Sequence, residues 1–350
     1  MKYRTLGASD ILVSEICLGT MTWGSQNNQS DADEQLEVAF DAGINFIDTA
    51  EMYAIPPNAE TYGVTEKIIG NWLKRNYSKR DKLVLATKIA GNGLPWIREG
   101  NDIDGKSIKK SIEGSLKRLQ TDNIDLYQLH WPNRTSPHFG KHWPAKLNFS
   151  SVDIKKEENK ILEILEALDK SIKEGKIRYF GLSDDTPWGI HAYLKISEKN
   201  NLPRPISIQN EFNLIHTKDW PYLIEMCVNE DIGFLPWSPL AGGALTGKYL
   251  NGARPKGSRW SLNPGSGFFR DTLKTNEAIK EFNKISREYN LPITELALSW
   301  CKGTDGVTST IIGATNLRQL KQNISAFNLE LKDEIKEQIN DILRKYPLPF

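Results

Sequence analysis

The sequence has few cysteines, almost no excess charge and no long hydrophobic run. Its three cysteines, Cys17, Cys227 and Cys301, are too few and too scattered for a disulfide framework or a zinc site. Lys and Arg total 45 against 44 Asp and Glu, so the net charge of +1 gives no support for binding nucleic acid. The longest weakly polar stretch, 232–247, contains two prolines and four glycines and is too short to span a bilayer. We therefore expect a cytoplasmic protein with reduced thiols and neither a nucleic-acid nor a membrane partner.

The sequence does contain a regular alternation of short apolar runs and amphipathic stretches. The runs that we predict to be strands are 16–19, 44–48, 83–88, 124–129, 177–182, 206–209, 232–235 and 310–312. They are mainly apolar rather than alternating, as expected for parallel strands that are covered on both faces. Eight strand–helix units predict an α/β fold, a parallel eight-stranded (β/α)8 TIM barrel that forms a single domain over residues 1–350. A doubly wound open sheet is the alternative, because periodicity does not show whether the sheet closes.

Two long irregular segments, 131–153 and 251–270, are expected to lie over the active face of this barrel. The first contains four large aromatic residues, which favours a binding lid over a spacer. The second is rich in Gly, Pro, Arg and aromatic residues. Trp96 and Trp131 lie in loops that should overhang the mouth, and we predict that they contact substrate.

Polar residues follow the predicted strands, where a parallel barrel forms its active face. Lys88 ends a buried strand and needs a counter-charge, for which Asp48 is the candidate. Lys88 near Tyr53 would favour the phenolate and lower the Tyr53 pKa from about 10 toward the working range. Tyr53 could then give a proton to a carbonyl oxygen that His130 orients. This equipment is typical of a carbonyl reductase whose cofactor supplies the hydride.

Three other signals are weaker. The segment 242–248 nearly spells a phosphate-binding P-loop, but Tyr249 stands where a magnesium-binding Ser or Thr is required, and no complete GxGxxG occurs. His138 and His142 have the spacing of metal ligands on a helix, but the residues between them form helices poorly, so we expect loop histidines and no metal site. Asp48 and Glu51 lie on one loop and so do not face each other as glycosidase carboxylates do.

The strand-end residues resemble the aldo-keto reductase pattern along nearly the whole chain. The matching segments are 48–53, Lys88, 126–132, 181–183, 237–240 and 313–315, followed by Gln319 and Asn323. The resemblance implies an NADPH-dependent oxidoreductase that reduces the carbonyl group of a small aldehyde or ketone. It implies that Tyr53 is the general acid, that Asp48 and Lys88 tune it, and that His130 orients the carbonyl.

The same resemblance implies a site for NADPH (NADP+). The residues that it places around the cofactor are Thr20, Met21, Gln26, Ser183, Asp184, Gln209, Trp237, Ser238, Pro239, Leu240, Lys248, Arg259, Gly313, Thr315, Gln319, Gln322 and Asn323. Lys248 and Arg259 could pair with a 2′-phosphate, so we expect NADPH to be preferred over NADH. The chain departs from the family pattern at Asp184, where Asn is common, and at Ala54, where Gly is common. Ala54 would disfavour a positive φ, so the loop after Tyr53 is expected to differ.

A second function class stays open within this resemblance. Some relatives bind the cofactor as regulatory subunits of potassium channels and turn over slowly, if at all. His130 favours the enzyme, because those relatives have another residue at that position.

Overall fold

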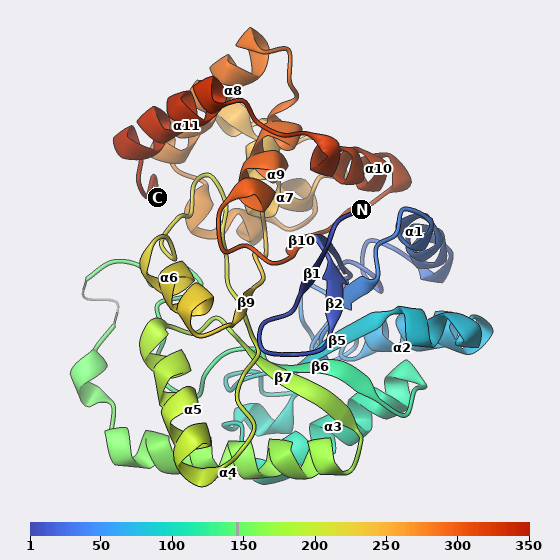
Figure 1. Ribbon diagram of the computed structural model, residues 1–350. Coiled ribbons are helices and arrows are strands. Elements are labelled where there is room, and N and C mark those ends of the chain that lie inside the picture. Colours follow the sequence, from blue (N-terminus) through green and yellow to red (C-terminus); the bar gives the residue numbers. More distant parts are fainter. Residues whose placement is uncertain (145–146) are drawn as a thin grey trace.

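Eight parallel strands form the centre of the structure, and helices surround them (Figure 1). The computed structural model describes residues 1–144 and 147–350, with the side chains of Ser266 and Phe268 left out of the description. The strands are β3 (Ile16–Gly19), β4 (Phe46–Asp48), β5 (Val84–Ile89), β6 (Ile124–Leu129), β7 (Ile177–Ser183), β8 (Ser207–Gln209), β9 (Gly233–Phe234) and β10 (Thr310–Ile312). Each predicted run overlaps one of them, and β5 and β7 each extend one residue beyond the predicted run. The order β10-β3-β4-β5-β6-β7-β8-β9 makes neighbours in the sequence neighbours in the sheet.

Hydrogen bonds between the two outer strands of this order close the sheet. The N–H of Thr308 donates to Phe234 O at 2.9 Å, and the N–H of Ile311 donates to Pro236 O at 2.9 Å. On its other side β10 pairs with β3, with Thr310 opposite Ile16. A doubly wound sheet would reverse its strand order at a switch point, and this sheet does not. The structure therefore confirms the (β/α)8 barrel and excludes the open sheet.

Helices follow the strands and cover the outside of the barrel (Figure 1). They are α1 (Gln29–Asp41), α2 (Val64–Arg75), α3 (Gly105–Leu119), α4 (Ile154–Lys173), α5 (Pro187–Asn200), α6 (Tyr222–Asn229), α7 (Arg259–Leu262), α8 (Leu273–Glu288), α9 (Ile293–Gly303), α10 (Leu317–Ser325) and α11 (Asp333–Lys345). Helix α4 shows why such segments fold on the sheet, because its Ile161, Leu165 and Leu168 form one buried stripe. Among the described residues, no helix is both long and apolar enough to cross a membrane.

Alternate residues of the strands face the barrel interior and the helices. Phe46, Ala86 and Leu126 belong to one interior apolar cluster. Because side chains alternate along a strand, the residues two positions further on point the same way, into the carboxyl end of the barrel. These residues are Asp48, Lys88 and Gln128. The pleat of three neighbouring strands thus brings an acid, a base and an amide to one place.

A β-hairpin that the sequence pattern did not indicate covers the amino ends of the strands (Figure 1). It pairs β1 (Tyr3–Thr5) with β2 (Leu12–Ser14) in antiparallel fashion. Leu6, Ile11 and Val13 are buried in the same cluster as the interior residues of the strands. The hairpin therefore closes this end of the barrel.

The two long segments differ in structure. Within 131–153 the described residues hold one short 3-10 helix, Phe149–Ser151, and residues 145–146 lie outside the description. The prediction of an irregular 251–270 was wrong in part, because α7 and a 3-10 helix, Pro264–Arg270, lie within it. A serine before α7 and a proline at the first position of the 3-10 helix suit such starts. All three cysteines are free and buried, as expected.

Candidate active site

At the carboxyl end of the barrel, Asp48 binds Lys88 and two amides. Lys88 Nζ lies 2.6 Å from Asp48 Oδ2, and both side chains are buried. Gln128 Nε2 and Gln209 Nε2 donate to Asp48 Oδ1 at 3.0 and 2.9 Å. Lys88 also donates to the carbonyl oxygen of Thr49 at 2.8 Å. The predicted counter-charge of Lys88 is confirmed, and both oxygens of its carboxylate have hydrogen-bond donors.

Lys88 and Tyr53 form the next layer, with Lys88 Nζ 5.0 Å from the centre of the Tyr53 ring. Burial alone would lower the pKa of Lys88, but Asp48 above all raises it beyond its ordinary value, so the ammonium stays charged. Burial raises the pKa of Tyr53, and Lys88 offsets this only in part. The expectation that Lys88 lowers this pKa toward neutrality is therefore wrong for the free protein. Desolvation of the phenolate is the larger effect, so Tyr53 keeps its proton.

His130 lies beside Tyr53, with 5.7 Å between ring centres. Burial, and then the charge of Lys88, hold the pKa of His130 well below its ordinary value, so the ring is neutral. Its Nδ1 is buried and has no hydrogen-bond partner within the described part of the chain. The ring of Trp131 follows at 5.1 Å, and its Nε1 donates to Asn92 O at 3.2 Å. The four predicted catalytic residues thus lie in one group beside one predicted substrate contact.

Asp184 and Trp237 lie on the other side of the mouth, where Asp184 follows β7 and Trp237 lies shortly after β9. Trp237 Nε1 donates to Asp184 Oδ1 at 3.1 Å. Asp184 has a φ of +49°, a conformation that Asp and Asn both tolerate. The replacement of the more common Asn by Asp therefore requires no change of backbone conformation at this position. Burial raises the pKa of Asp184 well above its ordinary value. Ser183 Oγ donates to Gln209 O at 2.9 Å, which adds two more predicted cofactor residues to this side.

The second departure is also accommodated. Ala54 is not among the residues with positive φ, and its N–H donates to Thr61 O at 3.2 Å. The loop after Tyr53 therefore has a conformation that needs no glycine at this position.

Three predicted cofactor residues follow β3. Thr20 is buried, and its Oγ1 donates to the carbonyl oxygen of Asp48 at 2.8 Å. The carbonyl oxygen of Met21 accepts the N–H of Ile55 at 2.8 Å. Gln26 is half-buried. This segment therefore lies against the loop that carries Tyr53.

Another predicted group surrounds the start of α10. Thr315 donates from its N–H and its hydroxyl to Gln319 Oε1, each at 3.1 Å. Asn323 Nδ2 donates to the carbonyl oxygen of Gly313 at 3.1 Å. Gln322 is exposed. These residues lie close together around the start of α10. Their polar side chains could form hydrogen bonds with a ligand.

The segment after β9 offers a cradle for an oxygen-rich group. Gly242 and Gly243 have φ values of +63° and +95°. A Cβ on Gly242 would meet only one atom within 4 Å, Trp260 Nε1 at 4.0 Å. That nitrogen is a buried donor without a partner among the described residues, which is the situation that a phosphate oxygen would resolve. Ser238, Pro239 and Leu240 lead into this turn, and Lys248 follows it, with Nζ 5.2 Å from the ring centre of Tyr249.

Arg259 is half-buried at the start of α7. Burial, and then Arg270, lower its pKa, while the phenols of Tyr249 and Tyr53 act in the opposite direction.

One further residue at this end, Gln128, was given no role by the sequence analysis. It lies in an apolar run, and a polar residue inside such a run is a signal that could have found it. Phe139 is one of the four aromatic residues of 131–153, and it reaches across the mouth, with its ring stacked on Trp237 at 6.1 Å and edge-on to Trp131 at 6.4 Å. Trp96 directly precedes the buried Ile97, and 38% of Trp96 is exposed. No cluster of three or more His, Cys, Asp and Glu suited to a metal lies within residues 1–144 and 147–350.

Comparison with known proteins agrees with this geometry. A family model described as the aldo/keto reductase family matches residues 15–344. The chain belongs to the aldo/keto reductase family. This aldo/keto reductase is 40% identical over 356 aligned positions to "Protein tas" of Escherichia coli (strain K12), with 100% of this chain and 99% of that protein covered. It is 32% identical to "Uncharacterized oxidoreductase YrpG" of Bacillus subtilis (strain 168), over 98% of this chain and 96% of that protein.

The resemblance extends beyond bacteria. A protein named "Aldo-keto reductase" from Babesia bovis is 35% identical over 77% of this chain and 98% of its own length. The family suggested by the strand-end residues is therefore confirmed, and the protein is an oxidoreductase of that family.

Proposed function

We propose that this aldo/keto reductase uses NADPH to reduce an aldehyde or ketone to an alcohol, with Tyr53 as the general acid. The observation that carries the proposal is the position of Tyr53, whose ring centre lies 5.0 Å from Lys88 Nζ and 5.7 Å from the centre of the His130 ring. NADPH, when bound, supplies the hydride that reduces the carbonyl carbon.

Tyr53 gives its phenolic proton to the carbonyl oxygen as negative charge develops there. The Lys88 ammonium, 5.0 Å from the ring centre, stabilises the phenolate that remains. Asp48 fixes Lys88 at 2.6 Å and compensates its charge, so the buried ammonium is retained. In this proposal Tyr53 is catalytic, and Asp48 acts through Lys88.

His130 orients the carbonyl. A neutral imidazole has one N–H to donate, and the unpartnered Nδ1 leaves the ring free to adopt the tautomer that the substrate needs. A hydrogen bond from this ring to the carbonyl oxygen would point that oxygen toward Tyr53, whose ring centre lies 5.7 Å away. Orientation of this kind lowers the barrier because the reacting atoms are already aligned.

The cofactor site is proposed from three groups of residues. Ser183, Asp184, Gln209 and Trp237 would hold the nicotinamide end, and the Gly242–Gly243 turn with Trp260 Nε1 would accept the phosphates. Lys248 and Arg259 would pair with the 2′-phosphate, which only NADPH carries. This pairing supports a preference for NADPH over NADH.

A titration followed on tryptophan emission tests the cofactor assignment directly. We expect NADPH to quench the emission with a Kd at least about tenfold lower than that of NADH, equivalent to about 1.4 kcal/mol. Trp237→Phe should reduce the amplitude of quenching while the remaining signal still saturates. Equal dissociation constants would contradict the NADPH preference, and no binding of either dinucleotide would contradict the cofactor assignment. Protein that binds NADPH is then assayed with a panel of aldehydes and ketones.

A further inference from the structure

A fully buried glutamate lies directly behind the Tyr53 loop and accepts four hydrogen bonds. Glu51 Oε1 accepts from the N–H of Ala90 at 2.7 Å and from Arg98 Nη1 at 2.7 Å. Its Oε2 accepts from Ser111 Oγ at 2.5 Å and from the hydroxyl of Tyr62 at 3.2 Å. The Glu51 side chain is 0% exposed and that of Arg98 is 18% exposed. Nothing in the proposed chemistry uses this ion pair, although a buried charge is costly to keep.

Glu51 connects the two segments that carry the reacting groups. It lies two residues before Tyr53, and Ala90 lies two residues after Lys88. The N–H of Glu51 also donates to the carbonyl oxygen of Lys88 at 3.1 Å. One residue thus holds the Tyr53 loop to the end of β5 through both its backbone and its side chain.

Arg98 is the other half of the pair and holds a strained turn. Arg98 and the following Glu99 have φ values of +49° and +55°. A non-glycine residue in this conformation costs on the order of 1 kcal/mol and persists only when its surroundings hold it there. Arg98 Nη2 donates to Ala90 O at 2.5 Å, beside its bond to Glu51. The guanidinium therefore fixes the turn to the same point at which Glu51 fixes the Tyr53 loop.

The turn held by Arg98 is part of the wall of the mouth. Ile97 is buried in one apolar cluster with Tyr53, and Trp131 packs against that cluster. At the start of the same loop, a Cβ on Gly91 would lie 2.1 Å from Trp131 Nε1, so only glycine permits this approach. Trp96, a predicted substrate contact, lies two positions before Arg98. A shift of this loop would move the wall against which a substrate is bound.

We propose that Glu51 and Arg98 are positioning residues of the carbonyl-reducing site. The existence of that site rests on the function proposed above. The pair sets the distance between Tyr53 and the 91–100 wall and thereby determines the affinity for the carbonyl substrate. It touches neither the reacting atoms nor the residues proposed to bind cofactor. Its loss should therefore act mainly on KM for the carbonyl and leave NADPH binding unchanged.

The chain contains a matched pair that serves as a control. Glu66 is also 0% exposed, and Arg118 is 15% exposed, with 2.6 Å between Arg118 Nε and Glu66 Oε2. Glu66 Oε1 accepts from Thr87 Oγ1 at 2.7 Å. This pair lies between α2 and α3, and among the described residues Glu66 accepts hydrogen bonds from Thr87 and Arg118 and from no residue of the Tyr53 loop or the 91–100 wall. Glu66→Gln makes the same chemical change as Glu51→Gln at a site that should not reach the substrate.

The experiment compares E51Q, E66Q and R98K with wild type, using the best aldehyde from the carbonyl panel. We expect E51Q to raise KM for the aldehyde about tenfold and to lower kcat about threefold, because small misplacements at a reacting centre are costly. R98K, which keeps the charge but not the two-pronged contact, should fall between E51Q and wild type. E66Q should stay within about twofold of wild type in both constants, although its melting temperature falls as much as that of E51Q. The Kd for NADPH should be unchanged in all three.

Two results would overturn the proposal. One is E51Q with wild-type KM and kcat. The other is equal loss of kcat/KM in E51Q and E66Q in proportion to their loss of folded protein, which would make the role structural only. If wild type reduces no carbonyl, the proposed function fails, and the positioning role is then read from hydrogen exchange. Amides of residues 91–100 should exchange at least about tenfold faster in E51Q than in wild type and E66Q, and equal rates would refute the proposal.

Discussion

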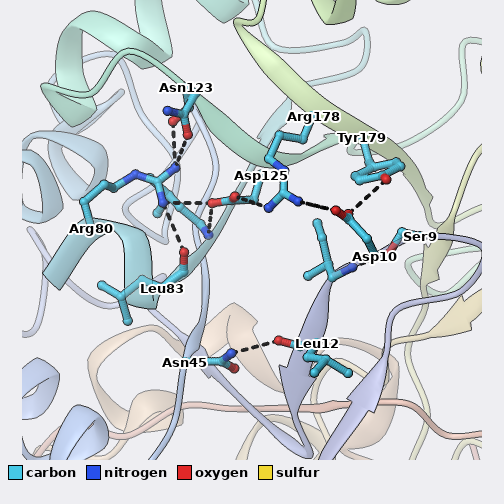
Figure 2. Close-up of polar contacts among 12 residues, drawn as sticks. Ser9, Asp10, Leu12, Asn45, Arg80, Leu83, Asn123, Asp125, Arg178 and Tyr179 are labelled. Carbon is cyan, nitrogen blue, oxygen red and sulfur yellow. Dashed lines mark hydrogen bonds and ion pairs between the residues drawn. The ribbon is translucent and has the colours of Figure 1, made fainter.

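The two ends of the barrel both bury charged side chains, but they use them differently. At the amino end Asp125 lies between two guanidiniums, 2.9 Å from Arg80 Nη1 and 3.1 Å from Arg178 Nη1 (Figure 2). Arg178 continues to Asp10 of the hairpin at 2.9 Å, and Arg80 donates to Asn123 Oδ1 at 2.7 Å. A hollow of about 500 Å³ lies beside this network. The charged side chains of the network are nevertheless paired with one another.

At the carboxyl end the charged side chains are paired, but some buried polar atoms have no hydrogen-bond partner among the described residues. Asp48 and Lys88 compensate each other, whereas His130 Nδ1 and Trp260 Nε1 are buried without a partner among the described residues. Buried polar atoms are nearly always hydrogen-bonded in folded proteins, so such exceptions require an explanation. The difference is that the buried charges of the Asp125 network are paired with one another, whereas His130 Nδ1 and Trp260 Nε1 are left for a substrate or a cofactor to satisfy.

The largest expected effect is on activity at the carboxyl end. Tyr53→Phe removes the proposed acid and should lower kcat/KM for an aldehyde about 10³-fold, equivalent to about 4 kcal/mol. The free energy of unfolding and the Kd for NADPH should change little, because the ring remains. Steady-state kinetics and urea unfolding measure the two quantities. Retention of most of the turnover would show that Tyr53 is not the acid.

The second effect is on stability at the amino end. Asp125→Asn leaves the buried Arg80 without its carboxylate and should lower the free energy of unfolding by about 3 kcal/mol. The kcat/KM of the folded fraction should equal that of wild type, since the network lies at the other end of the barrel. Denaturant unfolding and active-site titration by NADPH test this together. A loss of activity without a loss of stability would break the distinction between the two ends.

The hairpin contact should contribute less. The side chain of Asp10 is 70% exposed and that of Arg178 is 42% exposed, so water screens their attraction. Asp10→Asn should therefore cost less than about 1 kcal/mol of unfolding free energy in the same assay. A cost equal to that of Asp125→Asn would mean that the hairpin is held by this ion pair rather than by Leu6, Ile11 and Val13.

The smallest expected effect is that of pH in the neutral range. Burial raises the pKa of Tyr53 and lowers that of His130, so Tyr53 stays protonated and His130 stays neutral between the two. Reduction needs the protonated phenol and is lost only as pH rises through the raised pKa. From about pH 7 to about pH 9, kcat/KM should vary less than about twofold. An apparent pKa within that interval would show that the bound cofactor or Lys88 outweighs desolvation.

The sequence predicted the strands and the grouping of polar residues at the mouth for a definite physical reason. Strands of a parallel barrel are buried on both faces, so each one is a local apolar run, and the first polar residues after it lie at the shared mouth. Asp48, Lys88 and His130 follow this rule, and their convergence needs no information beyond the order of the runs. Tyr53 is less local, because it lies five residues beyond Asp48, on the loop that follows the strand.

What the sequence did not predict depends on contacts between distant segments. Glu51 and Arg98 are 47 residues apart, and each lies in a turn. Hydrophobic periodicity predicts helices and strands, but it does not indicate which turn residues contact each other. The hairpin was missed because three-residue strands are too short to show alternation. The direction of the Tyr53 pKa was missed because it depends on how completely the loops exclude water, which a list of neighbouring charges does not contain.

The closure of the barrel has a consequence for how the chain is made. Ile16 in β3 finds its partner Thr310 in β10 about 290 residues later, and Ser309 Oγ donates to the carbonyl oxygen of Ser14 at 2.7 Å. At about 5–20 residues per second, a ribosome needs roughly 15 to 60 s to deliver that partner. During this time β3 has one unpaired edge, a surface that pairs readily with other chains. The first strand of the barrel to be synthesised therefore keeps one edge unpaired until the last strand has been made.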